Sequence, residues 1–169
     1  MPRPEIRAHQ LPRLREFTWQ KILSMIMVPK QILYVEDNLV NQLLMTEMVT
    51  RCTTHKLQIA RTMREGLRMA TQQDYDVLLL DLRLPDGNGP ELLQLLRRFP
   101  QYADIPAVAV TAEYGFDPAG TSFSEVWFKP LDIHQTLDGL DRVLRNAPER
   151  TEAHAGMPSR AASALAAFP

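Results

Sequence analysis

Apolar residues occur along this chain in short runs, each followed by polar turn residues and a longer segment with helical spacing. The most apolar run covers residues 77–80 and ends directly at Asp81. A short continuous apolar run bounded by turn residues predicts a strand that is buried on both faces of a sheet. Strands are likewise predicted at residues 31–35, 55–60, 105–110 and 125–128.

Segments with helical spacing of apolar residues separate these strands. The predicted helices cover residues 39–51, a segment that opens at position 62, residues 90–99 and residues 133–146. Asn38 and Asp132 are typical N-cap residues, and Thr62 with Glu65 has the form of a capping box. Five strands that alternate with helices predict an α/β fold, in which helices cover both faces of a parallel sheet.

The composition agrees with one domain flanked by two tails. The chain has 169 residues, of which 45% are hydrophobic and 23% are charged, as in ordinary globular proteins. We predict the α/β domain at residues 29–146. Residues 1–28 are expected to form an N-terminal extension, and residues 147–169, which are rich in Ala, Ser, Pro and Arg, a disordered tail.

The N-terminal extension leaves three interpretations open. It is an upstream addition with the true start at Met25 or Met27, a mobile arm, or a helix that binds a partner. The last interpretation depends on a rough apolar stripe that includes Leu14 and Trp19.

Charge, hydropathy and cysteine content restrict the class of protein. The formal net charge of −1 indicates no general nucleic-acid footprint. No apolar run approaches the ~20 residues of a membrane span. The single cysteine, Cys52, cannot form an internal disulfide. We therefore expect a cytoplasmic protein in which Cys52 is a buried thiol.

Polar side chains stand directly after four of the predicted strands. Glu36 and Asp37 follow the first strand and Asp81 follows the third, while Thr111 and Lys129 follow the last two. Parallel strands place their carboxyl ends at one edge of a sheet, where open α/β proteins bind ligands. These five side chains are therefore expected to lie close together.

Three clustered carboxylates need positive charge nearby, because two like charges ~4 Å apart repel by about 4 kcal/mol at an effective dielectric constant of about 20. Oxygen ligands of this kind suit Mg²⁺. A carboxylate beside a metal ion, with a lysine and a hydroxyl group opposite, is a layout for phosphoryl transfer. The sequence therefore predicts that Asp81 is a nucleophile.

The same residues resemble the receiver domain of bacterial two-component response regulators. The matching motifs are Glu36-Asp37-Asn38, Asp81 with Pro85 and Gly89, Thr111-Ala112, and Lys129-Pro130. The resemblance covers residues 31–145 and is most similar to receivers attached to hybrid sensor kinases. It implies a flavodoxin-like (βα)5 fold with a doubly wound parallel sheet of strand order 2-1-3-4-5.

The resemblance also implies a role for each residue that contacts the phosphoryl group. Asp81 would accept this group from a histidine kinase or a histidine phosphotransfer protein. The Thr111 hydroxyl would move toward the phosphoryl group, and Lys129 would be its ion-pair partner. Such a domain catalyses only its own phosphorylation and dephosphorylation, and it is not otherwise an enzyme.

The resemblance further implies how Mg²⁺ would be held. Asp37 and Asp81 would bind the metal ion directly, and Glu36 would act through water. The backbone carbonyl of Arg83 would complete the protein ligands. Arg83 and Glu113 each lie two residues past a site residue, at offsets that flank the phosphate entrance in receivers.

Two features depart from the receiver pattern. Val126 stands where receivers usually carry Tyr or Phe, three residues before the lysine. The segment between Thr111 and Lys129 is short and contains Gly115, Pro118 and Gly120, which are poor helix formers. We therefore expect a shortened or degenerate fourth helix and an altered output surface; alternatively, these are a tolerated core substitution and simple sequence drift.

Other functions remain as alternatives. A pseudo-receiver would signal without phosphate, and an Mg²⁺-dependent aspartyl-phosphate hydrolase would need a second acid where Arg83 stands. A flavin-binding domain would need a hydroxyl-rich loop where Glu36 and Asp37 stand. We expect output by contact with a downstream protein partner, because the residues after 146 are too few for a DNA-binding domain.

Overall fold

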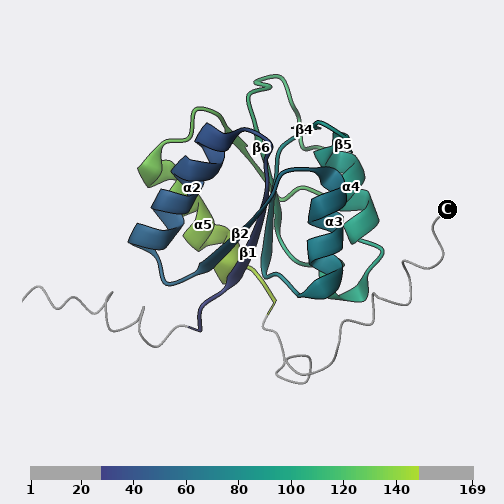
Figure 1. Ribbon diagram of the computed structural model, residues 1–169, viewed down its shortest axis with the longest axis horizontal. Helices are drawn as coiled ribbons and strands as arrows, with labels where there is room; N and C mark the ends of the chain where they lie inside the picture. Colours follow the sequence, from purple (N-terminus) through teal and green to yellow (C-terminus); the bar gives the residue numbers. More distant parts are fainter. Residues whose placement is uncertain (1–27, 149–169) are drawn as a thin grey trace, which may run out of the picture.

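The computed structural model describes residues 28–148, which form a parallel sheet between two layers of helices (Figure 1). The predicted N-terminal extension and C-terminal tail lie almost entirely outside the described residues. The sheet has the order β2-β1-β3-β6-β7, and all its neighbouring strands are parallel. Its strands are β1 (Gln31–Val35), β2 (Lys56–Ala60), β3 (Val77–Leu80), β6 (Ala107–Thr111) and β7 (Glu125–Phe128). Counted within the sheet, this is the predicted order 2-1-3-4-5.

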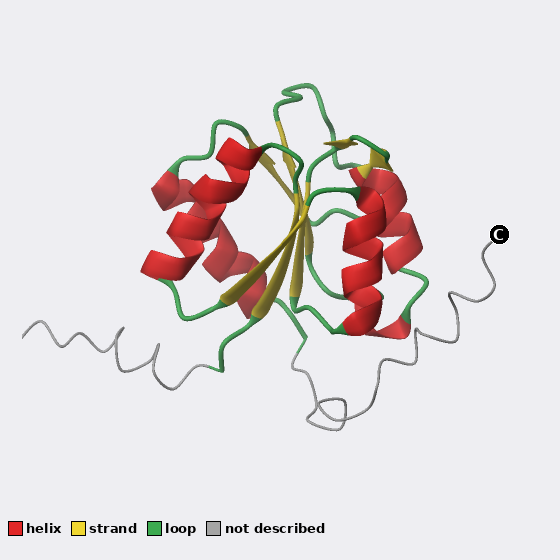
Figure 2. Cartoon of the chain, viewed as in Figure 1, coloured by secondary structure: helices red, strands yellow, loops and turns green. Residues whose placement is uncertain are grey.

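Helices cover both faces of the sheet (Figure 2). The described helices are α2 (Leu39–Cys52), α3 (Met63–Gln72), α4 (Gly89–Leu96) and α5 (Ile133–Arg145), followed along the chain after α4 by a short 3-10 turn, η2 (Pro100–Tyr102). Helices α2 and α5 lie on one face, and α3 and α4 lie on the other (Figure 1). None of the described helices is both long and apolar enough to cross a membrane.

Alternate residues of the central strands face two separate cores. Leu33 and Leu78 belong to the core beneath α3 and α4, whereas Ile32 and Leu79 belong to the core beneath α2 and α5. All four residues of β3 are 0% exposed. Because both faces of this strand are buried, its sequence is continuously apolar rather than alternating. The packing on both faces fixes the end of β3, and with it the position of Asp81.

Three helices begin at the N-caps that the sequence predicted. The side chains of Asn38, Thr62 and Asp132 each accept a hydrogen bond from a backbone N–H in the first turn of the following helix. The capping box is only partly closed. Glu65 donates its backbone N–H to Thr62, but its carboxylate accepts from the backbone N–H of Arg61 at 2.8 Å.

The segment between β6 and β7, residues 112–124, contains no helix. The rings of Phe116 and Phe123 meet edge to face, with centroids 6.0 Å apart, and both pack against the core beneath α3 and α4. The Arg97 guanidinium donates a hydrogen bond to the carbonyl of Ser122 at 3.1 Å. The expectation of a shortened or degenerate fourth helix, between β6 and β7, is confirmed, and a loop anchored by aromatic packing stands in its place.

The start of β6 and the exposure of Cys52 differ from the sequence prediction. Strand β6 begins at Ala107, two residues later than predicted, because Pro106 has no N–H for the ladder. The carbonyl of Pro106 still accepts a hydrogen bond from the backbone of Leu78 at 3.1 Å. Cys52 is the last residue of α2 and is exposed, so the expectation of a buried thiol was wrong.

The loop after β3 contains a short antiparallel ribbon that the sequence pattern did not predict. Its strands are β4 (Arg83–Leu84) and β5 (Gly87–Asn88). Asp86 lies between them, and its carboxylate accepts hydrogen bonds from the backbone N–H groups of Met63 at 2.7 Å and Arg64 at 3.0 Å. Asp86 therefore caps helix α3 from a loop that is distant in the sequence.

Replacement of Asp86 with alanine is expected to lower the free energy of unfolding by about 1 kcal/mol at pH 7, as is typical for loss of a helix cap. Slight burial raises the pKa of Asp86, but the two N–H groups outweigh it, and the net pKa lies below the ordinary value. The stabilisation is therefore present above pH ~4, the unfolded-state pKa, and is lost as the pH falls through the folded-state pKa.

Urea denaturation of Asp86→Ala and the wild type at pH 7 and at pH 3 checks this prediction. Asp104→Ala is the matched control, since Asp104 is also an exposed loop aspartate. An equal difference between Asp86→Ala and wild type at both pH values would contradict the proposed cap.

Candidate functional site

The carboxyl ends of four parallel strands bring the predicted site residues to one edge of the sheet. In the register of the sheet, Val35 pairs with Leu80. The next residue of each strand is an acid, and the Asp81 backbone donates to the Val35 carbonyl at 2.9 Å. At the other side, the backbone N–H of Lys129 donates to the Thr111 carbonyl at 2.8 Å. The side chains of all four strand ends therefore face a common region.

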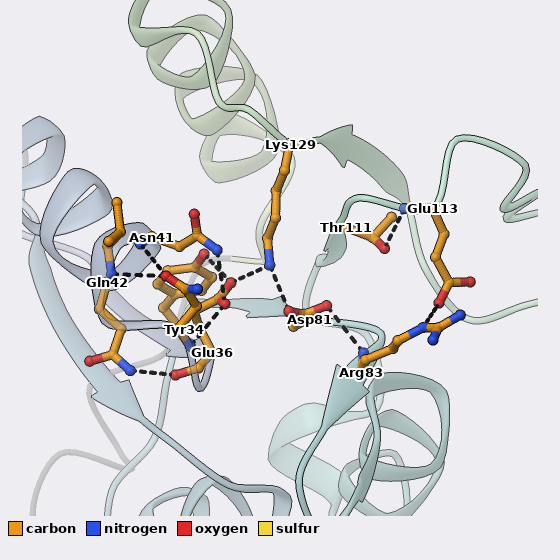
Figure 3. Close-up of polar contacts among 11 residues, drawn as sticks. Tyr34, Glu36, Asn41, Gln42, Asp81, Arg83, Thr111, Glu113 and Lys129 are labelled. Carbon is orange, nitrogen blue, oxygen red and sulfur yellow. Dashed lines mark hydrogen bonds and ion pairs between the residues drawn. The ribbon is translucent and has the colours of Figure 1, made fainter.

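Lys129 lies between two buried carboxylates (Figure 3). Its ammonium nitrogen is 2.6 Å from Asp81 Oδ2 and 2.5 Å from Glu36 Oε2. Burial lowers the pKa of Lys129, but the hydrogen bonds to Asp81 and Glu36 outweigh it and leave the pKa above its ordinary value. Lys129 is therefore protonated at neutral pH, and its charge neutralises part of the acidic cluster.

Glu36 is fully buried and accepts four hydrogen bonds or ion-pair contacts. Its Oε2 accepts from the Tyr34 hydroxyl at 2.7 Å, in addition to the Lys129 ammonium. Its Oε1 accepts from the backbone N–H of Asn38 at 3.2 Å and from the Asn41 side-chain amide at 3.1 Å. A carboxylate has about four lone-pair positions, so these donors occupy all of them.

Tyr34 and Asn41 are site residues that the sequence analysis missed. Burial, followed by the nearby Glu36 carboxylate, raises the pKa of Tyr34, so its hydroxyl stays protonated and remains a donor. The sequence does carry a signal for this contact, because residues two apart on a strand point to the same side. The contact of Asn41 depends on how α2 leaves the sheet, and the sequence pattern alone does not give that direction.

Asp81 is 8% exposed and has a donor on each oxygen. Oδ2 accepts from Lys129, and Oδ1 accepts from the backbone N–H of Arg83 at 3.1 Å. Burial raises the pKa of Asp81, and these two donors offset only part of the effect. Gly89 approaches closely, because a Cβ atom at that position would lie 2.4 Å from the Asp81 carbonyl oxygen. The turn after β3 therefore needs glycine there to keep Asp81 in place.

The Thr111 hydroxyl lies at the end of β6 and is almost fully buried. Its oxygen accepts a hydrogen bond from the backbone N–H of Glu113 at 3.0 Å, which leaves the hydroxyl proton able to serve another acceptor. The Glu113 carboxylate forms an ion pair with the Arg83 guanidinium (Figure 3). This pair links the loop after Asp81 to the loop after Thr111.

The acidic residues can hold a metal ion. Carboxylate oxygens of Glu36, Asp37 and Asp81 lie within 4.8 Å of one another. Asp37 is exposed, whereas the other two are buried. A donor set made only of oxygen atoms, open to water on one side, suits Mg²⁺ better than zinc or copper.

Comparisons with known proteins agree with the fold. The response regulator receiver domain family matches residues 32–123, a span that ends before β7. The response regulator ArlR of Staphylococcus saprophyticus is 31% identical over 124 residues, which are 71% of this chain and 54% of that protein. The histidine-protein kinase BarA of Escherichia coli is 26% identical over 108 residues, which are 60% of this chain and 12% of the kinase. The chain therefore spans little more than half of ArlR and a small part of BarA.

Solved receiver structures share the architecture. Vibrio cholerae chemotaxis protein CheY4 has a TM-score of 0.65 and 22% identity, and the match covers 69% of this chain and 99% of CheY4. The receiver domain of the Pseudomonas aeruginosa sensor histidine kinase PA1611, solved with magnesium in its active-site cleft, has a TM-score of 0.64 and 24% identity. That match covers 70% of this chain and 99% of the other. With the family match over more than half of the chain, this protein belongs to the response regulator receiver domain family.

Proposed function

We propose that Asp81 is the phosphoacceptor of a two-component phosphorelay. The observation that carries the proposal is the contact of one lysine, Lys129, with two buried carboxylates, Asp81 and Glu36, beside the exposed Asp37. A single ammonium does not neutralise three acids. The site therefore favours the binding of a further cation. It also favours a group that both this cation and Lys129 can contact.

The proposed reaction moves one phosphoryl group from a phosphohistidine to Asp81. A carboxylate oxygen of Asp81 forms a bond to phosphorus as the phosphorus–nitrogen bond of the donor breaks, and the electron pair returns to the imidazole nitrogen. Water later attacks phosphorus, and the bond to the Asp81 oxygen breaks, which releases inorganic phosphate and restores the carboxylate. The donor is a histidine kinase or a histidine phosphotransfer protein.

Mg²⁺ would be held by Asp37 and Asp81 together with the backbone carbonyl of Arg83. Glu36 would act through water. The four protein donors on its oxygens count against a direct bond to the ion, and a bridging water would take the place of one of these donors. When bound, the ion supplies positive charge for the phosphoryl oxygens.

Phosphorylation adds roughly 1.5 to 2 negative charges at neutral pH, which need donors at the sheet edge. Lys129 is in contact with Asp81 and is the cation placed to pair with a phosphoryl oxygen. The Thr111 hydroxyl accepts from the Glu113 backbone, so its proton is available for a second phosphoryl oxygen. The exposed ion pair between Arg83 and Glu113 stands beside this site, where it affects access of water.

We further propose that the signal leaves by contact with a protein partner in the cytoplasm. The described surface around β7 differs from the same surface of a receiver that has a helix between β6 and β7, because residues 112–124 form an anchored loop here. Arg83 stands where an aspartyl-phosphate hydrolase would need a second acid, and it is engaged with Glu113.

Incubation with Mg²⁺ and phosphoramidate, followed by intact-mass measurement, tests the proposed reaction. We expect the mass of one phosphoryl group to be added in the presence of Mg²⁺ and not in the presence of excess chelator. The label should be lost in mild alkali, as acyl phosphates are. Failure of the folded protein to gain this mass with Mg²⁺ would overturn the proposal in favour of signalling without phosphate.

A further inference from the structure

Tyr114 is an exposed aromatic residue in the loop after β6, yet it makes two defined contacts. Its ring stacks on Phe128, with centroids 5.4 Å apart and an interplanar angle of 19°. Its hydroxyl donates to the backbone carbonyl of Lys129 at 2.8 Å. Tyr114 is 71% exposed and Phe128 is 39% exposed. The contacts therefore belong to neither core, and they join the loop after Thr111 to the segment that carries Lys129.

The rest of this loop is held without Tyr114. Phe116 and Phe123 pack against the core, and Arg97 donates to the carbonyl of Ser122. Strand β7 is in turn paired with β6 along its length. These contacts already hold the loop and β7 in place, so folding does not require the stacked, exposed ring of Tyr114. The contacts of Tyr114 therefore point to a role at the nearby site.

The residue before Tyr114 makes the matching links on the other side. The Glu113 backbone donates to the Thr111 hydroxyl, and its side chain pairs with Arg83. The Arg83 backbone in turn donates to Asp81. Two adjacent residues thus connect the hydroxyl, the lysine and the carboxylate. Such links hold the reacting groups in a fixed geometry, and a displacement of about 1 Å can lower the reaction rate strongly.

We propose that Tyr114 is a positioning residue for phosphoryl transfer. Through its hydroxyl and its stack on Phe128, Tyr114 clamps the backbone of Lys129 to the loop of Thr111. The clamp sets the distance between the ammonium and the hydroxyl that bind the phosphoryl oxygens. This inference rests on the proposed reaction at Asp81.

Three variants test the clamp. Tyr114→Phe removes the hydroxyl and keeps the stack, and Phe128→Leu removes the stack and keeps the hydroxyl. Tyr75→Phe is the matched control, because the buried Tyr75 also donates its hydroxyl, to Gln58 at 2.7 Å, and precedes β3 at the opposite edge of the sheet. Each variant is labelled with phosphoramidate and Mg²⁺ over a range of donor concentrations. Hydrogen exchange of the Lys129 amide is measured without phosphate.

We expect Tyr114→Phe and Phe128→Leu each to lower the maximal rate constant of labelling about fivefold, the effect of one lost contact expressed in the transition state. The half-saturating donor concentration should not change, because the proposed clamp acts on Lys129 and Thr111 and not on the donor. Lys129 amide exchange should accelerate in both variants. Tyr75→Phe should match the wild type in rate constant and in Lys129 exchange.

Any other result contradicts either the positioning role of Tyr114 or the proposed reaction at Asp81. Wild-type rates in Tyr114→Phe and Phe128→Leu, or equal slowing in Tyr75→Phe, would overturn the positioning role, even if Lys129 exchange were faster. If the wild type takes up no label, the reaction at Asp81 fails. The clamp is then tested by hydrogen exchange of the Lys129 amide alone. Unchanged exchange in both variants would refute the clamp.

Discussion

Replacement of Asp81 with asparagine is expected to abolish labelling by phosphoramidate and by a phosphorylated histidine kinase domain. The amide nitrogen cannot act as the nucleophile that the carboxylate oxygen provides, and it removes one metal ligand. Glu36 is also buried, in contact with Lys129 and directly after a strand, but protein donors occupy all four lone-pair positions of its carboxylate. Intact mass after incubation with Mg²⁺ and donor measures the loss.

The Asp81→Asn protein is also expected to stay folded. Burial raises the Asp81 pKa, so the ionised carboxylate is less stable in the fold than in water, and a neutral amide removes that cost. Its free energy of unfolding at pH 7 should equal or exceed that of the wild type. The control Asp104→Asn alters an exposed aspartate and should label normally. Full labelling of Asp81→Asn would place the phosphoacceptor elsewhere.

Replacement of Lys129 with methionine is expected to have the largest effect on stability. The change leaves Glu36 and Asp81 buried without their cation, and loss of one partner from a buried ion pair costs about 3 kcal/mol. Addition of Mg²⁺ should restore part of this loss, because the ion replaces the missing positive charge. The double variant Lys129→Met/Asp81→Asn should also recover stability, because it removes one of the two carboxylates.

Urea denaturation with and without Mg²⁺ measures these effects. Lys56→Met is the matched control, because Lys56 is an exposed lysine at the start of β2. It should unfold like the wild type under both conditions. If Lys129→Met unfolded at the wild-type denaturant concentration without Mg²⁺, the ammonium would not be neutralising the two acids as the structure indicates.

Much of the fold was predictable because the pattern of apolar residues indicates which segments are buried. The apolar run before Asp81 is continuous since both faces of β3 are covered, and its end fixes where the carboxylate stands. Poor helix formers such as Pro118 and Gly120 indicated a shortened or degenerate fourth helix. Parallel pairing then brought Asp81 and Lys129 to the same edge.

Contacts between distant side chains were not predictable, because no local pattern encodes them. Asp86 caps α3 across 22 to 23 residues, and the Arg83–Glu113 pair spans 30. The sequence analysis likewise named neither Tyr34 nor Asn41, which both donate to the Glu36 carboxylate. Cys52 was expected inside by residue type, but it is the last residue of α2 and is exposed.

The contacts of Tyr114 bear on the absence of an aromatic residue at position 126. Val126 packs against the core beneath α3 and α4 together with Phe116. Tyr114 is instead an aromatic residue that reaches the Lys129 carbonyl from the surface. A change of state at Asp81 is therefore expected to be felt first in the loop of residues 112–124.

The most direct measurement is the chemical location of the phosphoryl group. The wild-type protein is labelled by a phosphorylated histidine kinase domain with Mg²⁺, reduced with borohydride, digested and sequenced by mass spectrometry. Reduction converts an aspartyl phosphate to homoserine. The account predicts homoserine at position 81, with Asp37 and Glu36 intact. Homoserine at another position, or none in a protein that has taken up phosphate, would contradict the assignment of Asp81.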